Sequence, residues 1–352
     1  MKKNMHIVIL MILFASGQML FAQYENPVEK SVGLEKSGQT TMNFLQVGVV
    51  PDAVAIGEAY TALGTGVQSM FYNPAGLAEM SRSFEIFASS VQWIADIQYL
   101  AGGVAYDTEE YGVIGISFLT VDYGDIIGTR LLTTEEQATN PLGYIETGMV
   151  DNVGAYAFGL TYARKITNVF SVGIGVRYAA QQLGSQVLGQ YMASGQTRNN
   201  EMNKVVFDLG VKYYTPIKSF RFAMSIRNFA SSVKYEEIST QLPFTFAVGA
   251  AIDLMDFIEP DHDQNNTLLL SSEFSHPNNY TERIHTGIEY TFMGMFSLRG
   301  GYVTNHDLNG LSLGVGLKTD IMQATTTSIS YSYSTISEYF DDVNRFSVMF
   351  SF

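Results

Sequence analysis

The chain has 352 residues, a length compatible with one large β domain or with two smaller domains. It contains no cysteine, which excludes disulfides, thiolate chemistry and cysteine-based zinc sites. Its formal net charge of -14 argues against nucleic acid as a partner, because phosphate binding needs a basic face.

The first 22 residues have the layout of a secretory signal peptide. Lys2 and Lys3 give a positively charged start, residues 7–15 are apolar, and the small residue Ala22 precedes the predicted cleavage site. No later segment has the roughly 20 consecutive apolar residues that a transmembrane helix needs. If the mature chain lies in a membrane, it must therefore be a closed barrel, in which every backbone hydrogen bond is satisfied.

Residues 23–82 show no regular alternation and are rich in glycine, proline and small side chains. We predict that this segment folds as a hatch inside or beneath the strands that follow, and residues 53–63 could include a short helix. A free tail is the alternative, but the apolar content of residues 53–63 argues against disorder.

From residue 83 to residue 352, apolar and polar side chains alternate with a period of two. Because successive side chains of a strand face opposite sides, each such segment has one apolar and one polar face. The pattern predicts about fourteen strands, an even number that is typical of bacterial barrels. The predicted strands span residues 83–92, 97–106, 112–122, 153–163, 170–181, 204–214, 220–228, 244–254, 267–275, 283–292, 296–303, 310–319, 327–334 and 344–352.

Charge placement distinguishes a transmembrane barrel from a soluble sandwich, which would show the same alternation. From about residue 156 onward the apolar faces carry no charge, as expected if a charge facing lipid costs about 2–4 kcal/mol at mid-membrane. We therefore predict an all-β, transmembrane antiparallel barrel with charges facing its lumen. These charges could bind a polar substrate, but ion pairs between strands and hatch are favoured, because buried charges need partners. The predicted lumen-facing charges are Arg177, Asp208, Lys212, Arg221, Arg227, Asp253, Glu273, Arg283, Glu289, Arg299, Lys318 and Arg345.

Connection lengths also alternate. With a periplasmic N-terminus, the long connections 123–152, 182–203 and 229–243 would lie outside the cell. The short connections 164–169 and 215–219 would face the periplasm, as would residues 293–295. Long outer loops and short inner turns are typical of outer-membrane barrels. The exception is residues 255–266, a longer inner connection.

Four stretches resemble the opening of the PorV/PorQ family, part of the larger group of FadL-type outer-membrane barrels. They are MNFLQVG at residues 42–48, AVAIGEAYTAL at 53–63, MFYNPAGLA at 70–78 and WIADI at 93–97. Beyond these residues the resemblance is architectural. It implies a fourteen-stranded barrel with an N-terminal hatch in the lumen.

The resemblance places the family's Asn-Pro-Ala element at Asn73, Pro74 and Ala75 of the hatch. Pro74 fixes its own φ and disfavours the helical region for Asn73, so this element is a rigid turn. The following Gly76 permits a close approach of another backbone.

The best-known members of this family act in type IX secretion, where they receive cargo with a C-terminal signal domain and deliver it to the surface attachment machinery. The resemblance therefore implies a non-catalytic protein of the outer membrane. Its partners would be lipid and either secreted cargo proteins or secretion machinery subunits. The alternative is a FadL-type channel for a hydrophobic ligand, in which the hatch moves to open a path.

Two motifs could indicate a hydrolase or a metal site, but in neither case does the sequence favour that function. Residues 310–314 match G-x-S-x-G around Ser312, yet a nucleophile elbow needs a strand–turn–helix context and this motif lies within an alternating strand. Gly314 and Gly316 are better explained as leaving room for the hatch. Residues 261–263 (DHD) are only a partial metal site, since calcium usually takes six or more oxygens. We predict no catalytic residues, no metal and no cofactor.

Overall fold

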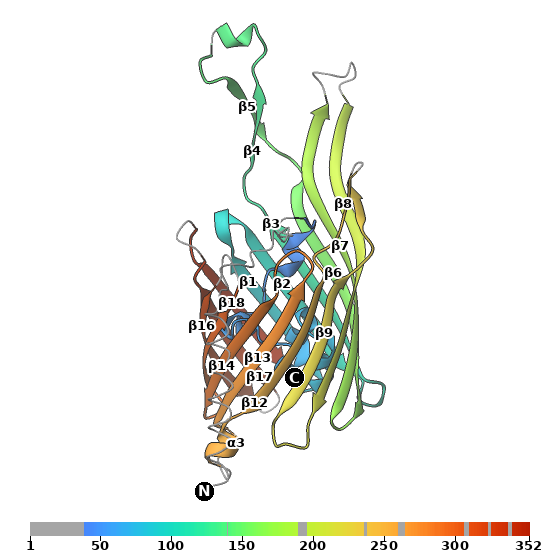
Figure 1. The fold of residues 1–352 in the computed structure, drawn as a ribbon, viewed down its shortest axis with the longest axis vertical. Coiled ribbons are helices and arrows are strands. Elements are labelled where there is room, and N and C mark those ends of the chain that lie inside the picture. Colours follow the sequence, from blue (N-terminus) through green and yellow to red (C-terminus); the bar gives the residue numbers. More distant parts are fainter. Residues whose placement is uncertain are drawn as a thin grey trace, which may run out of the picture.

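The computed structural model describes residues 39–138, 140–188, 196–235, 238–259, 265–305, 310–322, 325–336 and 340–352. The predicted signal peptide and residues 261–263 lie outside these ranges. In the described part, fourteen strands form one closed antiparallel barrel (Figure 1). The prediction of the fold class is confirmed.

Each strand of the barrel pairs with its sequence neighbours, and the first strand closes the ring by pairing with the last. Every predicted strand is present, including the first two, where the alternation is weakest. The strands are β1 Phe84–Gln92, β2 Gln98–Asp107, β3 Val113–Asp122, β6 Val153–Thr167, β7 Phe170–Leu188, β8 Gln196–Tyr214, β9 Arg221–Phe229, β12 Thr245–Asp253, β13 Thr267–Pro277, β14 Arg283–Phe292, β15 Phe296–Val303, β16 Leu311–Met322, β17 Thr325–Ser334 and β18 Val343–Ser351.

The outer face of the barrel is apolar and the inner face is not. On β16, Leu313 and Val315 are each 50% exposed, whereas Ser312, the residue before Leu313, is 1% exposed. A continuous exposed apolar surface of this kind is rare on soluble proteins. It is the expected surface of a strand that faces lipid on one side and a packed lumen on the other.

The connections at the outer end of the barrel are more elaborate than the sequence predicts. β4 Ile127–Leu131 and β5 Tyr144–Met149 pair as a separate arm that stands beyond the barrel, and β7 and β8 also rise above its rim (Figure 1). β10 Val233–Tyr235 and β11 Ile238–Thr240 form a further small hairpin.

The prediction of a loop over residues 182–203 is wrong, because β7 continues to Leu188 and β8 begins at Gln196. Two neighbouring strands can keep pairing beyond the membrane, where both faces meet water and no apolar alternation is needed. Sequence periodicity therefore ends before the strands do.

In the described part, four short helices lie in the connections. α3 Met255–Ile258 follows β12 at the end that is predicted to face the periplasm, η4 Ile94–Asp96 and η5 Glu109–Tyr111 lie in the short connections on either side of β2, and η6 Glu136–Ala138 lies in the turn of the β4–β5 arm. None of the helices in the described part is long and apolar enough to cross a membrane.

The segment before β1 lies in the lumen as a hatch. It comprises η1 Asn43–Gln46, α2 Pro51–Ala55, η2 Gly66–Phe71 and η3 Pro74–Glu79. Thr40 bridges to Gln241 in the outer connection before β12, whereas η3 packs on β6, β7 and β8 nearer the periplasm.

The helix predicted within residues 53–63 begins earlier and is shorter, since α2 ends at Ala55. Gly57 and Glu58 adopt φ of 64° and 63°, which a helix cannot continue through.

Candidate functional site

The Asn73–Pro74 element caps η3 and ties the hatch to the wall. Asn73 has extended backbone angles, and its Oδ1 accepts a hydrogen bond of 3.0 Å from the backbone N–H of Ala75. Its Nδ2 donates to the carbonyl of Thr61 at 2.9 Å and to that of Val211 on β8 at 3.2 Å. One buried amide thus holds the turn, a second stretch of hatch and the barrel together.

Glycines on the wall let this element approach closely. A Cβ atom at Gly210 would lie 1.9 Å from Oδ1 of Asn73, and one at Gly173 would lie 2.3 Å from the carbonyl carbon of Pro74. Gly76 has the same role within the hatch, where a Cβ would meet a carbonyl oxygen at 2.2 Å. Any side chain at these positions would force the hatch away from the wall.

The opposite wall of the barrel shows the same close packing. A Cβ at Gly301 would lie 1.9 Å from a backbone nitrogen of the hatch, and one at Gly314 would lie 2.4 Å from Cβ of Ala55. Gly314 therefore leaves room for the hatch as predicted. Gly316 does not, because a Cβ there would instead meet the guanidinium of Arg299 at 2.6 Å.

A buried ion pair anchors the periplasmic end of the hatch. The Lys212 side chain is 0% exposed, and its Nζ lies 2.7 Å from Oε2 of Glu79, the last residue of η3. The same ammonium donates to the carbonyl of Gly64 at 3.1 Å, and Tyr214 donates to Oε2 of Glu79 at 2.9 Å. Removing one partner of such a pair leaves an uncompensated buried charge, which is strongly destabilising.

A second anchor holds α2. Arg299 on β15 lies between Asp52 of the hatch, at 3.0 Å, and Glu289 of β14. Nearby, the buried carboxylate of Glu273 accepts a 2.9 Å hydrogen bond from the backbone N–H of Thr61. Wall charges thus neutralise a hatch carboxylate and satisfy a hatch amide.

Two arginines hold the outer part of the hatch. Arg345 is 2% exposed, donates from Nε to the carbonyl of Gly48 at 2.8 Å and lies over the ring of Trp93. The guanidinium of Arg227 lies 5.1 Å from the ring centroid of Tyr72. Cation–π contacts of this kind help to hold positive charge in the lumen, where Glu58 of the hatch also attracts the guanidinium of Arg345.

One predicted pair stays within the wall. Nε of Arg177 lies 2.7 Å from Oδ2 of Asp208, and both side chains are nearly buried. Oδ1 of Asp208 also accepts the backbone N–H of Asn228, a residue at φ 59° beside a bulge between β8 and β9.

Three of the other four predicted charges, Asp253, Arg221 and Lys318, make no hydrogen bond or ion pair with the hatch between described residues. Oδ1 of Asp253 accepts backbone N–H bonds from Met255 in the following turn and from Leu268 on β13. Arg221 and Arg283 lie over tyrosine rings, at 5.7 and 4.7 Å from the centroids. Lys318 is exposed, because it stands near the periplasmic end of β16.

Sequence reasoning missed several hatch contacts. Glu85 on β1 is 2% exposed and its Oε2 accepts the backbone N–H of Val67 at 2.8 Å. His285 on β14 is buried and its Nδ1 lies 2.7 Å from the carbonyl of Gly57. The position of Glu85 between two apolar neighbours was a usable signal, but the alternation of this strand is weak. Asp52 could not be found, because the hatch has no periodicity.

The outer half of the lumen contains a large apolar cluster, and it is filled. The residual cavity there has a volume of about 20 Å³, room for about one water molecule. Apolar residues of the wall meet the first stretch of the hatch in one buried cluster, with Met42, Phe44, Leu45 and Val49 from the hatch and Val91, Tyr99, Leu119, Val121, Met202 and Val206 from the wall.

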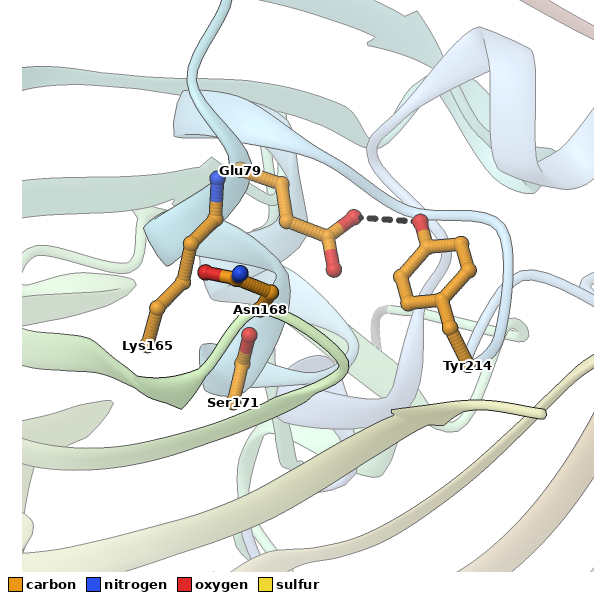
Figure 2. Close-up of a pocket in the computed structure, with 5 residues that line it drawn as sticks. All are labelled: Glu79, Lys165, Asn168, Ser171 and Tyr214. Atoms are coloured by element: carbon orange, nitrogen blue, oxygen red, sulfur yellow. Dashed lines mark hydrogen bonds between the residues drawn. The ribbon is translucent and has the colours of Figure 1, made fainter. Parts of the chain in front are cut away.

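A larger cavity of about 320 Å³, bordered by residues with polar side chains, lies at the periplasmic end (Figure 2). Glu79 borders it from the hatch and Tyr214 from β8. Lys165, Asn168 and Ser171 border it from β6, β7 and the turn between them.

No protein-family model and no curated protein sequence matches the chain. Solved structures do match. The chain aligns with the CymD monoaromatic hydrocarbon channel at a TM-score of 0.55 and 13% identity, over 87% of this chain and 98% of that one. The chain aligns with the Ralstonia pickettii toluene transporter TbuX at a TM-score of 0.52 and 14% identity, over 86% of this chain and 97% of that one. With a Pseudomonas aeruginosa FadL homologue the TM-score is 0.50 and the identity 10%, over 86% of this chain and 98% of that one. The chain has the fold of a FadL-type outer-membrane barrel.

Identities this low establish the fold and not the substrate. The finer resemblance to the PorV/PorQ family stays a prediction. These neighbours are channels and transporters, in agreement with the prediction of a non-catalytic protein. Ser312 of the G-x-S-x-G sequence is 1% exposed and donates to Ser334. Across the described ranges, no three His, Asp or Glu side chains gather as a metal site.

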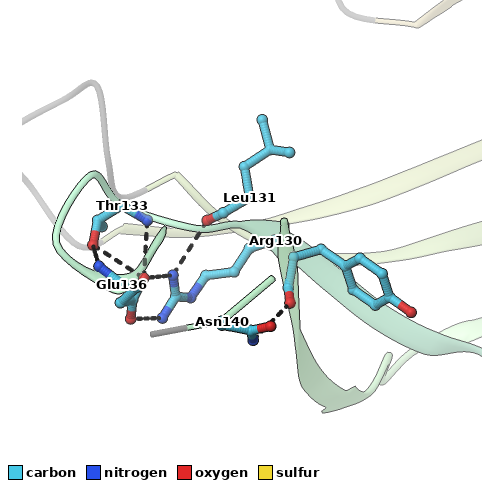
Figure 3. A network of polar contacts seen from close by, with 6 residues as sticks. Arg130, Leu131, Thr133, Glu136 and Asn140 are labelled. Atoms are coloured by element: carbon cyan, nitrogen blue, oxygen red, sulfur yellow. Dashed lines mark hydrogen bonds and ion pairs between the residues drawn. The ribbon is translucent and has the colours of Figure 1, made fainter. Parts of the chain in front are cut away.

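The β4–β5 arm is a further exposed feature of this FadL-type barrel. Leu131 is 79% and Met149 is 64% exposed, and the register places both on one face of the hairpin with Ile127 and Tyr144. Figure 3 shows the turn beyond β4, where the guanidinium and carboxylate of the Arg130–Glu136 pair meet at 2.7 Å.

The carboxyl group of Glu136 in this turn has a low pKa. Hydrogen bonds from Arg130, and then from the backbone of Thr133, lower the pKa of Glu136 to about 2. Residues 123–152 hold five acidic residues and one arginine, so the arm is acidic as well as apolar.

Proposed function

We propose that this FadL-type barrel is a channel for hydrophobic small molecules and that its hatch closes it in the conformation described. The supporting observation is the buried apolar cluster of the outer lumen, in which apolar side chains of the wall pack against residues 42–49 of the hatch. An aqueous pore would be lined by polar side chains. The similar folds of a monoaromatic hydrocarbon channel and a toluene transporter favour the same substrate class.

The contacts of the hatch suggest how it opens. Residues 39–50 are held by hydrogen bonds and apolar contacts, such as the 2.8 Å bond from Arg345 to the carbonyl of Gly48. Residues 51–83 carry the buried ion pairs of Asp52 and Glu79. If residues 39–50 left the lumen, they would vacate an apolar space in which a hydrophobic molecule could bind. Passage beyond it also requires residues 51–83 to shift, because α2 packs on β15, β16 and β17 and η3 packs on β6, β7 and β8.

A reversible lock tests this proposal. A Cβ at Gly249 on β12 would lie 3.5 Å from Cβ of Ala62 on the hatch, at the edge of the range found in disulfides. The chain has no cysteine, so the double variant Ala62→Cys, Gly249→Cys would form a single, defined bridge.

Uptake of radiolabelled toluene would be measured in cells that lack other channels of this type, with glycerol as the hydrophilic comparison. We expect the chain to accelerate toluene uptake only, oxidation of the double variant to abolish this gain, and reduction to restore it. If cells with and without the chain take up toluene equally fast, the channel proposal is wrong.

The β4–β5 arm supports a second candidate, reception of secreted cargo as in type IX secretion. Its apolar face is unsupported by the rest of the barrel, and an isolated two-stranded hairpin is only marginally stable in water. Replacing residues 125–150 with a short Gly-Ser linker should then make proteins with a common C-terminal signal domain accumulate in the periplasm. Unchanged export would remove this candidate, and toluene uptake by the same variant would separate the two functions.

A further inference from the structure

The cavity at the periplasmic end has the chemistry of a binding site that the channel does not need. Of its lining residues, Lys165, Asn168, Ser171 and Tyr214 can all donate hydrogen bonds, and only Glu79 is a carboxylate. Figure 2 shows Glu79 and Tyr214 on one side of the space and the three residues of the β6–β7 hairpin on the other. Its volume of about 320 Å³ is far more than one water needs.

Positive charge exceeds negative charge around this cavity. Lys212 lies directly behind Glu79 with its side chain fully buried, and Lys165 stands at the rim. Arg221 lies over the ring of Tyr214, and its Nε is buried without a hydrogen-bond partner in the described part of the chain. Three cations therefore surround one carboxylate, in a chain whose net charge is -14. Such a local excess favours an anion as ligand.

The Glu79 carboxylate restricts which anions can bind in the cavity. Oε2 of Glu79 already accepts from Lys212 and Tyr214, whereas Oε1 makes no hydrogen bond with any described residue. An anion in the cavity meets this free acceptor, and a fully deprotonated anion would be repelled by it. A hydrogen phosphate ion carries both acceptor oxygens and one P–OH donor at neutral pH. Sulfate and a phosphodiester have no such donor.

We propose that this cavity binds free hydrogen phosphate. The phosphate oxygens accept from Lys165, Asn168 and Ser171, and its P–OH donates to Oε1 of Glu79. Ser171 is 4% exposed and makes no side-chain hydrogen bond within the described ranges, so its hydroxyl is available. Because Glu79 belongs to the hatch and the donors belong to the wall, bound phosphate would join the two. This proposal does not depend on the substrate of the channel.

Calorimetric titration of the full chain in detergent micelles would test the site with three probes: inorganic phosphate, sulfate and glycerophosphoethanolamine, a phosphodiester lipid headgroup. We expect phosphate to bind at least about tenfold more tightly than either of the others, the size of one charge-assisted hydrogen bond. Equal binding of phosphate and sulfate, or tighter binding of the headgroup, would overturn the proposal.

Variants locate the binding. Lys165→Gln should weaken phosphate binding about tenfold and Ser171→Ala about threefold, whereas Lys318→Gln, an exposed lysine elsewhere on the inner face, should have no effect. Glu79→Gln replaces the acceptor with an amide that can donate, so the preference for phosphate over sulfate should fall toward one. Between described residues, neither Lys165 nor Ser171 makes a hydrogen bond or ion pair with the hatch, so their variants remain informative if Glu79→Gln releases the hatch. Unchanged binding in Lys165→Gln would refute the site.

Discussion

Replacing Arg299 with methionine should release the hatch locally without unfolding the barrel. The Arg299 side chain is 9% exposed and lies between Asp52, 16% exposed, and Glu289, 19% exposed. Without the guanidinium these two carboxylates face each other with no counterion. Breaking a buried pair in this way costs about 3–5 kcal/mol.

The lower end of that range applies here. The Arg299–Asp52 contact is ionic, since neither Nη1 nor Oδ1 has a hydrogen-bond partner among the described residues. A cost of about 3 kcal/mol corresponds to an increase of about 10²-fold in the population of the open hatch. Only Asp52 of the three lies on the hatch, so the cost falls on the hatch and not on strand pairing.

A single cysteine can report this opening, because the chain has none of its own. Ala53 in α2 is 0% exposed, and Ala53→Cys should react with a maleimide only when the hatch opens. We expect Arg299→Met to accelerate labelling about 10²-fold, with the urea midpoint of the barrel nearly unchanged. Adding Asp52→Asn should reverse part of the gain. Lys318→Met is the control, and equal labelling of Arg299→Met and its parent would refute the role of the ion pair.

Other predictions concern the wall and the outer arm. Leu313→Arg should destabilise the folded barrel by about 2–4 kcal/mol in urea titrations in lipid, since a charge would then face the membrane; a neutral result would contradict the assignment of faces. Gly301→Ala should push the hatch backbone away at a cost of about 1–3 kcal/mol, measured by the same cysteine reporter. Gly300→Ala should cost nearly nothing, because its Cβ would meet no atom closer than 3.7 Å. Glu136, with its pKa lowered to about 2, should stabilise the turn above the unfolded pKa of about 4.3 and lose this effect as the pH falls through about 2. The chemical shift of the Glu136 carboxyl would show this, and titration of Glu136 near the ordinary carboxyl value would contradict it.

The periodic part of the molecule was predictable because one physical rule acts on every residue of a transmembrane strand. Lipid on one side and a packed lumen on the other impose a period of two, and charges are confined to one face. That rule placed β1 at residues 83–92, where the structure has Phe84–Gln92, and β15 at its observed bounds. It failed where the rule stops acting, in the parts of β7 and β8 that rise above the membrane.

The residue range of the hatch was predictable, but the course of its backbone through the lumen and its contacts with the wall were not. The resemblance identified Asn73 and Pro74, and the structure adds what the amide of Asn73 binds. Nothing in the sequence pairs Asp52 with Arg299 or Glu79 with Lys212.

The sequence by itself determined the barrel, the number of its strands and the side on which its charges lie, because these follow from local alternation. The tertiary structure alone decided which charge meets which part of the hatch. Partners such as Glu79 and Lys212 are separated by 133 residues and come together only when the ring closes around the hatch. Contacts between such distant residues leave no periodic trace along the chain, so the anchoring of the hatch and the periplasmic cavity emerge only from the folded barrel.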